Sequence, residues 1–214
     1  MLMAGTDLHF GLFSRVPNRP GITENESFNE YFEIVAASEQ LNYDTIWIGE
    51  EHFAPGLWLS SSNITLASAV AMRTKRIRIG LAIVAMPLNH PLRIAEAVAT
   101  VDQLSHGRLD FGGGRSTNTE SYRRSDVSYL ESKERQEEAL EIIKKSWTTD
   151  RFSHRGKFYN FPDVALSPKP YQKPHPPIYM AVVSPYSFPW AGRMGYDIFI
   201  NPRGNRTELL KSFQ

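Results

Sequence analysis

The sequence contains no cysteine, no long apolar run and almost no excess of one charge. Without cysteine, the chain forms no disulfide and offers no thiolate nucleophile, zinc–thiolate site or iron–sulfur cluster. No apolar run approaches the roughly 18 residues needed to cross a membrane. The 24 Lys and Arg residues nearly balance the 23 Asp and Glu residues. This balance argues against nucleic-acid binding, which needs a basic excess to displace counterions.

Several sequence signatures of function are also missing. The first seven residues lack the basic and apolar regions of a signal peptide, which fits a cytoplasmic protein. The six histidines show no His-Glu-x-x-His or similar spacing, so we predict no metal site. No Gly-x-Ser-x-Gly motif indicates a serine hydrolase, and no Gly-x-Gly-x-x-Gly motif follows the first predicted strand.

Short apolar runs recur along the chain, and most are followed by a helical segment. The first four begin at residues 8, 45, 77 and 109, so they are spaced by 37, 32 and 32 residues. Their continuous apolar character is typical of parallel strands covered on both faces. The predicted strands are Leu8–Phe13, Thr45–Gly49, Ile77–Ala85, Leu109–Gly112, Ile178–Val183 and Asp197–Ile200.

Helix signals lie between these strands. Ser27 and Glu30 match a capping box, which predicts that a helix begins there. Pro91 is well placed as a first helical residue, and Gly107 as the stop of that helix. Residues 131–147 have apolar side chains at helical spacing and charged side chains between them.

Alternating strands and helices of this period predict an α/β fold. The choice lies between an open doubly wound sheet and a (β/α)8 TIM barrel, and the 32-residue spacing favours the barrel. We count six strands, and residues 207–214 resemble the start of a helix. We therefore expect residues 1–214 to form one barrel domain that is incomplete at its C-terminus, truncated after the sixth strand.

Residues 149–177 interrupt the regular alternation of strands and helices between the fourth and fifth strands. The chain from Arg151 to Phe161 suggests a β-hairpin that turns near Gly156, and five prolines then favour extended chain. We interpret this stretch as an insertion. Two roles stay open for this insertion: surface decoration and a substrate lid.

Two strand ends carry candidate functional residues, because barrel active sites lie at the C-terminal ends of strands. The fourth strand ends in three glycines and Arg115, which suits phosphate binding, and Ser184 and Ser187 could complete an anion site. The second strand ends in Glu50, Glu51 and His52, which could perform acid–base chemistry. Structural alternatives stay open: Arg115 could pair with an acid, Ser184 could cap a helix, and His52 could be buried.

Three stretches together resemble the bacterial luciferase-like flavin monooxygenase family. They are Tyr43-Asp-Thr-Ile-Trp-Ile-Gly-Glu-Glu-His-Phe, then His90-Pro91 with Asp102-Gln-Leu-Ser-His-Gly-Arg-Leu-Asp-Phe-Gly, and Pro168-Lys-Pro-Tyr-Gln-Lys-Pro-His-Pro-Pro-Ile-Tyr. The third stretch is most similar to the limonene-monooxygenase-like branch. The resemblance runs from Leu8 to about Arg206 and implies a (β/α)8 barrel that is usually dimeric.

The resemblance also implies site residues. Phe13 would line the flavin floor, and the peptide between Ala82 and Ile83 would be cis and lie beside the flavin ring. Arg115, Ser184 and Ser187 match phosphate-binding positions. Many members have a histidine where this chain has Glu51, so luciferase-like light emission is not expected. We hypothesise that His52 and Glu51 handle protons near the flavin.

The implied function is a monooxygenase that uses O2 and reduced FMN, supplied by a separate flavin reductase, to oxygenate a small organic substrate. A homodimer is expected for the complete barrel. Three alternatives remain open: hydride transfer with a deazaflavin coenzyme, a non-catalytic flavin-binding protein, and a phosphosugar barrel enzyme.

Overall fold

The chain folds around one curled parallel sheet. In this computed structural model, residues 8–184 and 186–200 are described, so the signal-peptide and 207–214 helix predictions lie outside the described residues. The strands lie in chain order, which is the order of a barrel. They are β1 (Gly11–Ser14), β2 (Thr45–Ile48), β3 (Arg78–Leu81), β5 (Leu109–Gly114), β8 (Ile178–Val182) and β9 (Asp197–Ile200). All the pairings between them are parallel, and the short β4 (Val84–Ala85) also pairs with β5.

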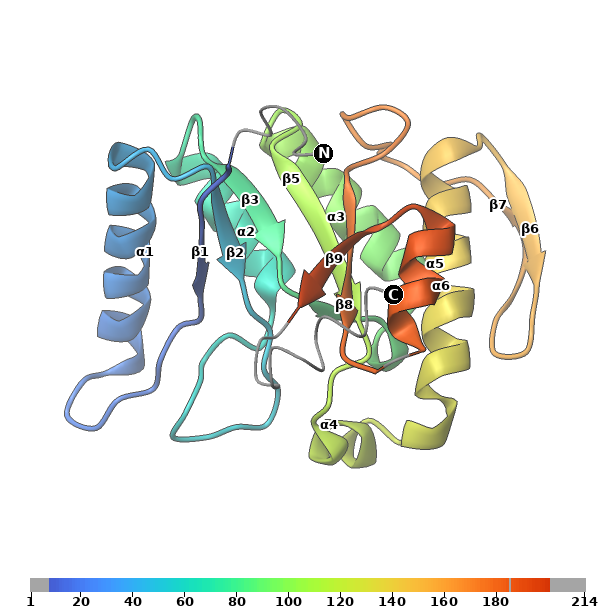
Figure 1. The fold of residues 1–214 in the computed structure, drawn as a ribbon, viewed down its shortest axis with the longest axis horizontal. Helices are drawn as coiled ribbons and strands as arrows, with labels where there is room; N and C mark the ends of the chain where they lie inside the picture. Colours follow the sequence, from blue (N-terminus) through green and yellow to red (C-terminus); the bar gives the residue numbers. More distant parts are fainter. Residues whose placement is uncertain (1–7, 185, 201–214) are drawn as a thin grey trace, which may run out of the picture.

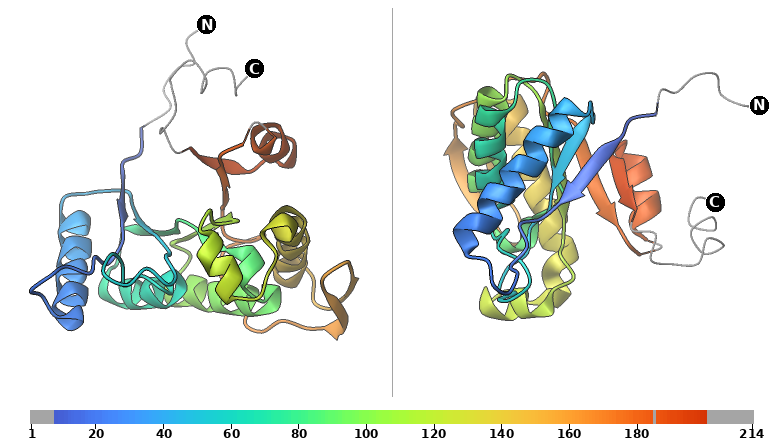
Figure 2. Two further views of the ribbon diagram at one scale, coloured as in Figure 1. Left: turned by 90° about the horizontal axis from the view of Figure 1, so that it is seen from below. Right: turned by 90° about the vertical axis from the view of Figure 1, so that its left-hand side faces the viewer.

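Helices follow the strands and cover the outer face of the sheet (Figure 1). They are α1 (Glu24–Gln40), α2 (Asn63–Arg73), α3 (Pro91–Leu104), α4 (Thr119–Arg124), α5 (Ser132–Thr148) and α6 (Ser187–Met194), with 3-10 turns at Met86–Leu88 and Tyr129–Glu131. Figure 2 shows α1, α2, α3 and α5 in a row, while β9 and α6 curl away from that row. The predicted (β/α)-barrel type of fold is confirmed: the described strands form a curled parallel half-barrel.

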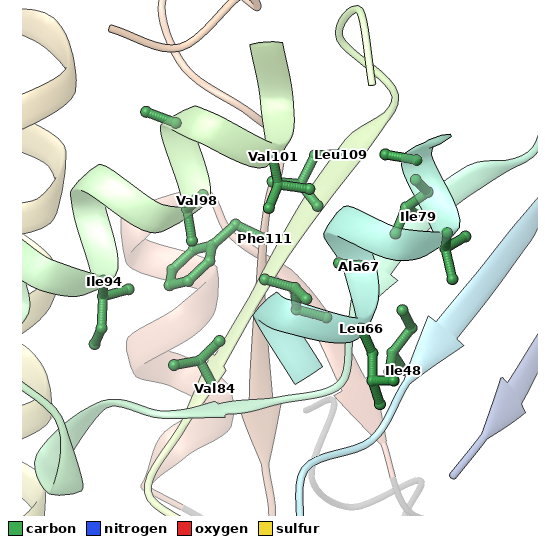
Figure 3. Packing of buried hydrophobic residues seen from close by; sticks show 14 of the residues in the cluster. Ile48, Leu66, Ala67, Ile79, Val84, Ile94, Val98, Val101, Leu109 and Phe111 are labelled. Atoms are coloured by element: carbon green, nitrogen blue, oxygen red, sulfur yellow. The ribbon is translucent and has the colours of Figure 1, made fainter. Parts of the chain in front are cut away.

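Side chains alternate between two different surroundings along the strands. Outward-facing residues such as Ile79, Leu109 and Phe111 are fully buried against the helices, and Figure 3 shows Phe111 packed beside Val98 of α3. The inner face carries aromatic rings instead: Trp47 contacts the rings of Tyr179 and Phe199 edge-on. These rings are largely apolar as well, so the predicted continuous apolar character holds on the outer face and at these inner positions.

The predicted capping box at Ser27 and Glu30 is wrong, because the helix begins one turn earlier. Thr23 is the N-cap: its hydroxyl accepts a hydrogen bond from the Glu26 amide at 3.2 Å. The Glu26 carboxylate accepts one from the Thr23 amide at 2.8 Å. Ser27 lies inside the first turn and is buried. Both pairs have the same spacing, but only Thr23 has the extended backbone of a cap.

The predicted third strand is interrupted rather than continuous over residues 77–85. β3 ends at Leu81 and β4 begins at Val84. The peptide bond between Ala82 and Ile83 is cis, as the resemblance implied. This break lies at the C-terminal end of the sheet, beside β5.

Two of the sequence stretches that carry the family resemblance join where β5 begins. Asp102 at the end of α3 is fully buried, and its carboxylate accepts hydrogen bonds from the amide of Gln172 at 2.9 Å and from its side chain at 2.8 Å. The Arg108 guanidinium donates to four backbone carbonyls, those of Ala71, Thr74, Ile77 and Ser105. These residues support the fold at the end of the sheet opposite the functional site.

Residues 149–177 contain an antiparallel hairpin of β6 (Phe152–Arg155) and β7 (Asn160–Val164). It lies beside α5, at the right-hand end of the molecule in Figure 1. Glu138 of α5 anchors it, since its carboxylate accepts hydrogen bonds from the Phe158 and Tyr159 amides at 3.0 and 2.9 Å. His154 lies 3.1 Å from the same carboxylate. This placement on the far side of α5 favours decoration over a lid.

Among the described residues, no helix is both long enough and apolar enough to cross a membrane.

Candidate functional site

A cavity of about 700 Å³ lies at the C-terminal ends of the parallel strands. This is the end at which parallel α/β proteins place ligands, and the volume is in the range of small-molecule and cofactor sites. Its lining comes from loops after β1, β2, β3, β5 and β8 and from α5 and α6. The lining residues include Arg15, Glu50, Glu51, His52, Ala82, Ile83, Arg115, Asn118, Lys133, Gln136, Ala181, Ser184, Ser187 and Trp190.

Arg115 follows β5 and enters the cavity with a free guanidinium. Its backbone carbonyl accepts a hydrogen bond from the Tyr122 hydroxyl. Within residues 8–184 and 186–200, its guanidinium makes no hydrogen bond and pairs with no carboxylate. The alternative that Arg115 pairs with a surface acid therefore finds no support here. An unpaired forked donor in a cavity is suited to a phosphate or carboxylate.

Ser184 and Ser187 lie together at the turn between β8 and α6. The Ser187 hydroxyl accepts hydrogen bonds from the amides of Val183 at 3.2 Å and Ser184 at 3.1 Å, and it donates to the Ser184 carbonyl at 2.6 Å. Among the described residues, the Ser184 hydroxyl makes one hydrogen bond, which it donates to the Ser187 hydroxyl at 3.3 Å. Ser187 thus builds the turn, and Ser184 keeps the more available hydroxyl.

Gly112, one of the glycines before Arg115, is required by strand packing. A Cβ on Gly112 would lie 1.8 Å from the Leu81 carbonyl oxygen and 2.8 Å from the Phe199 ring. The close approach of these glycines to a ligand stays a prediction. The β5 backbone needs the space to pass its neighbouring strand.

Glu50 and His52 form a hydrogen-bonded pair at the end of β2. His52 Nε2 lies 2.9 Å from Glu50 Oε1, and the same oxygen accepts the Ala85 amide at 3.2 Å. The hydrogen bond to Glu50 raises the pKa of His52, burial opposes this, and the charges of Glu50 and Glu51 raise the pKa further. Glu50 and His52 are two residues apart, so in extended chain their side chains lie on the same side.

Glu51 points to different partners. Its Oε2 lies 3.6 Å from Arg15 Nη1, and its Oε1 accepts a hydrogen bond from Asn118 Nδ2 at 3.1 Å. Arg15 is sandwiched between aromatic rings, with its Cζ 5.3 Å from the Phe13 centroid and 5.2 Å from that of Trp58. Glu51 therefore faces a cation and an amide donor rather than the imidazole of His52.

Of the six predicted cofactor-binding residues, five line this cavity and one does not. Ala82, Ile83, Arg115, Ser184 and Ser187 all line it, together with His52 and Glu51. Phe13 does not line it; its ring instead contacts the Arg15 side chain.

Sequence reasoning missed several polar residues of the cavity, among them Arg15, Asn118, Lys133 and Gln136. Asn118 had a signal, since it caps α4 by accepting the Glu120 and Ser121 amides. Gln136 had none: it lies on α5, it is 7% exposed, and its Oε1 has no hydrogen-bond partner within the described part of the chain. Lys133 Nζ lies 3.5 Å from the centroid of the Tyr186 ring. The Gln136 oxygen can accept a hydrogen bond from a molecule in the cavity.

Comparison with known proteins agrees with this geometry. The sequence profile of the luciferase-like monooxygenase family matches residues 8–211. The chain is 30% identical to the oxygenase component of a flavin-dependent trigonelline monooxygenase from Acinetobacter baylyi, over 84% of this chain and 50% of the relative. It is 28% identical to limonene 1,2-monooxygenase from Rhodococcus erythropolis, over 88% and 48% of the two chains.

Other similar proteins include a solved structure with the same fold and an enzyme that depends on a different coenzyme. The monooxygenase RslO1 from Streptomyces bottropensis superposes with a TM-score of 0.89 at 27% identity, over 96% of this chain and 64% of that one. An F420-dependent glucose-6-phosphate dehydrogenase from Amycolatopsis mediterranei is 31% identical, over 83% of this chain and 54% of the relative. The chain spans about half the length of the curated relatives it matches.

Proposed function

Since the chain belongs to the luciferase-like monooxygenase family, we propose that it is the oxygenase part of a flavin-dependent monooxygenase that uses reduced FMN and O2 on a small organic substrate. The observation that carries this proposal is the Arg115 guanidinium, which has no partner among the described residues and lines one cavity with Ser184 and the His52–Glu50 pair. A separate flavin reductase is the expected partner, which fits a relative described as an oxygenase component. A homodimer and a cytoplasmic location remain part of the proposal.

The cavity residues fit a flavin phosphate. Arg115 has free donors, Ser184 has an available hydroxyl, and the amides at the start of α6 add positive dipole ends. Ala82, Ile83 and Ala181 would lie against the ring system, and Trp190 adds a further apolar surface. When bound, reduced flavin would supply the electrons for activating O2.

We assign the residues of this chain three tasks. Arg115 and Ser184 bind the phosphate, and the apolar residues around the Ala82–Ile83 bond keep water from the ring. His52 holds or releases a proton within the cavity. Glu51, which contacts Arg15 and Asn118, shares this proton handling with His52 in the proposal.

Binding is tested by titrating the flavin-free protein with FMN and with riboflavin, followed by flavin fluorescence. FMN should bind more tightly, because riboflavin has no phosphate for Arg115. Equal affinities would remove the phosphate assignment, and absence of FMN binding would contradict the proposal.

Turnover is tested with NADH, a flavin reductase and a panel of small organic substrates. The expected result is O2 uptake that rises with one of the substrates. A protein that binds FMN tightly and shows no such uptake across the panel would instead be a non-catalytic flavin-binding protein.

Hydride transfer with a deazaflavin coenzyme is the second candidate, favoured by the similarity to an F420-dependent dehydrogenase. The two coenzymes differ in absorption, so a parallel titration with F420 distinguishes them. Tighter binding of F420 than of FMN would favour the dehydrogenase.

A further inference from the structure

Glu50 is more enclosed in the cavity than its neighbour Glu51. Its side chain is 6% exposed, compared with 23% for that of Glu51. It lies after β2, and its Oε1 is shared between His52 Nε2 at 2.9 Å and the Ala85 amide at 3.2 Å. One buried oxygen therefore connects the imidazole to the short strand that follows the Ala82–Ile83 bond.

We propose that Glu50 is the positioning residue for His52, an inference that rests on the proposed function for its place in the reaction. The carboxylate only accepts hydrogen bonds, so His52 must present Nε2–H to it. That arrangement selects one tautomer of the neutral ring and leaves Nδ1 as the nitrogen that gains and loses the proton. The Ala85 amide holds the carboxylate in turn, so the ring keeps a fixed orientation relative to β4.

The neighbouring groups support this assignment. Glu51 adds a second negative charge near His52, but it faces Arg15 and Asn118 rather than the imidazole. Asn118 also donates to the His52 carbonyl at 3.3 Å, which holds the backbone of the same loop. The Phe53 ring lies 6.0 Å from the imidazole centroid. Within the described residues, Glu50 is thus the carboxylate that bonds the ring itself.

The test compares Glu50→Gln with wild type in flavin-free protein. Glutamine keeps the size and an acceptor for the Ala85 amide but removes the charge. The titration midpoint of His52, followed by NMR and assigned with His52→Gln, should fall in Glu50→Gln. Glu137→Gln is the matched control, because Glu137 lines the same cavity and makes no hydrogen bond to His52. The titration midpoint of His52 in Glu137→Gln should equal that in wild type.

A second measurement ties the result to the reaction. With NADH and a flavin reductase, the pH profile of O2 uptake should shift to lower pH in Glu50→Gln, in the same direction as the NMR midpoint. Glu50→Asp, which keeps the charge, should restore part of the wild-type profile. A merely structural role would lower the rate without moving the profile.

The possible outcomes test the positioning role of Glu50 and the proposed function separately. An unchanged His52 midpoint in a folded Glu50→Gln protein overturns the positioning role. A shifted midpoint with an unmoved pH profile also overturns it for the reaction. If FMN does not bind while the midpoint shifts, the proposed function fails and the Glu50–His52 coupling stands.

Discussion

The Tyr122 hydroxyl donates a hydrogen bond to the backbone carbonyl of Arg115. This bond ties the start of the loop after β5 to α4, while the Arg115 guanidinium stays unpaired within the part of the chain that is described. The residue is therefore anchored through its backbone and available through its side chain. Burial raises the pKa of Tyr122 to about 12, so the hydroxyl remains a donor throughout the physiological range.

Replacing Arg115 with alanine should weaken FMN binding about 10- to 150-fold, since a hydrogen bond to a charged group contributes about 1.5–3 kcal/mol. Riboflavin affinity should change little, because it lacks the phosphate. Arg93→Ala is the control: Arg93 is 80% exposed on α3, and its removal should leave both affinities unchanged. Fluorescence titration that shows equal FMN affinity for Arg115→Ala and wild type would refute the assignment.

Two tyrosine substitutions should have opposite effects on the free energy of unfolding. Tyr122→Phe loses the bond to Arg115 and should destabilise the protein by about 0.5–1.5 kcal/mol. Tyr31 is buried and its hydroxyl has no partner among residues 8–184 and 186–200, so Tyr31→Phe should be neutral or stabilising. Urea denaturation of both variants measures the difference, and a loss of stability in Tyr31→Phe would reveal a partner for its hydroxyl.

The Glu50–His52 pair should make stability depend on pH. The pKa of His52 is raised in the folded protein. The stabilisation from the pair is therefore fully present below the pKa of unfolded histidine, and it is lost as the pH rises through the pKa of folded His52. Wild type should therefore exceed His52→Gln in stability by more at pH 5.5 than at pH 8.5. Urea denaturation at the two pH values checks this, and an equal difference at both would contradict it.

Replacing Glu138 with alanine should release the β6–β7 hairpin without affecting the cavity. The substitution leaves the Phe158 and Tyr159 amides without their acceptor, which costs about 1–3 kcal/mol. FMN affinity should stay the same, because no residue of 149–177 lines the cavity. Glu134→Ala, which removes an exposed pair with Lys157, is the control for stability. A large loss of FMN affinity in Glu138→Ala would restore the lid interpretation.

Gly112→Ala should destabilise the protein by at least about 1–3 kcal/mol, because the added Cβ meets the Leu81 carbonyl. Gly192→Ala offers a matched control on α6, where a Cβ meets nothing within 4 Å. There the change should be neutral or stabilising by about 0.5–1 kcal/mol, since alanine favours a helix. Thermal melts that rank the two variants the other way round would contradict this account of the glycines.

The sequence by itself determined the succession of strands and helices, since hydrophobic periodicity and capping residues are local properties. It also placed Arg115, His52 and Ser184 at strand ends, because an ordered parallel sheet brings all such ends to one edge. It did not distinguish Thr23 from Ser27 as a cap, because both have an acid three residues later and only the backbone path separates them.

Only the tertiary structure decided which neighbours meet. Arg15 reaches Glu51 from a different strand, and Gly112 is required by the carbonyl of Leu81, a contact between strands 31 residues apart in sequence. Glu50 and Glu51 are adjacent carboxylates, yet one bonds His52 and the other faces Arg15 and Asn118. Their roles depend on the direction of each side chain relative to the packed strands, and such directions follow from long-range packing rather than from residue type.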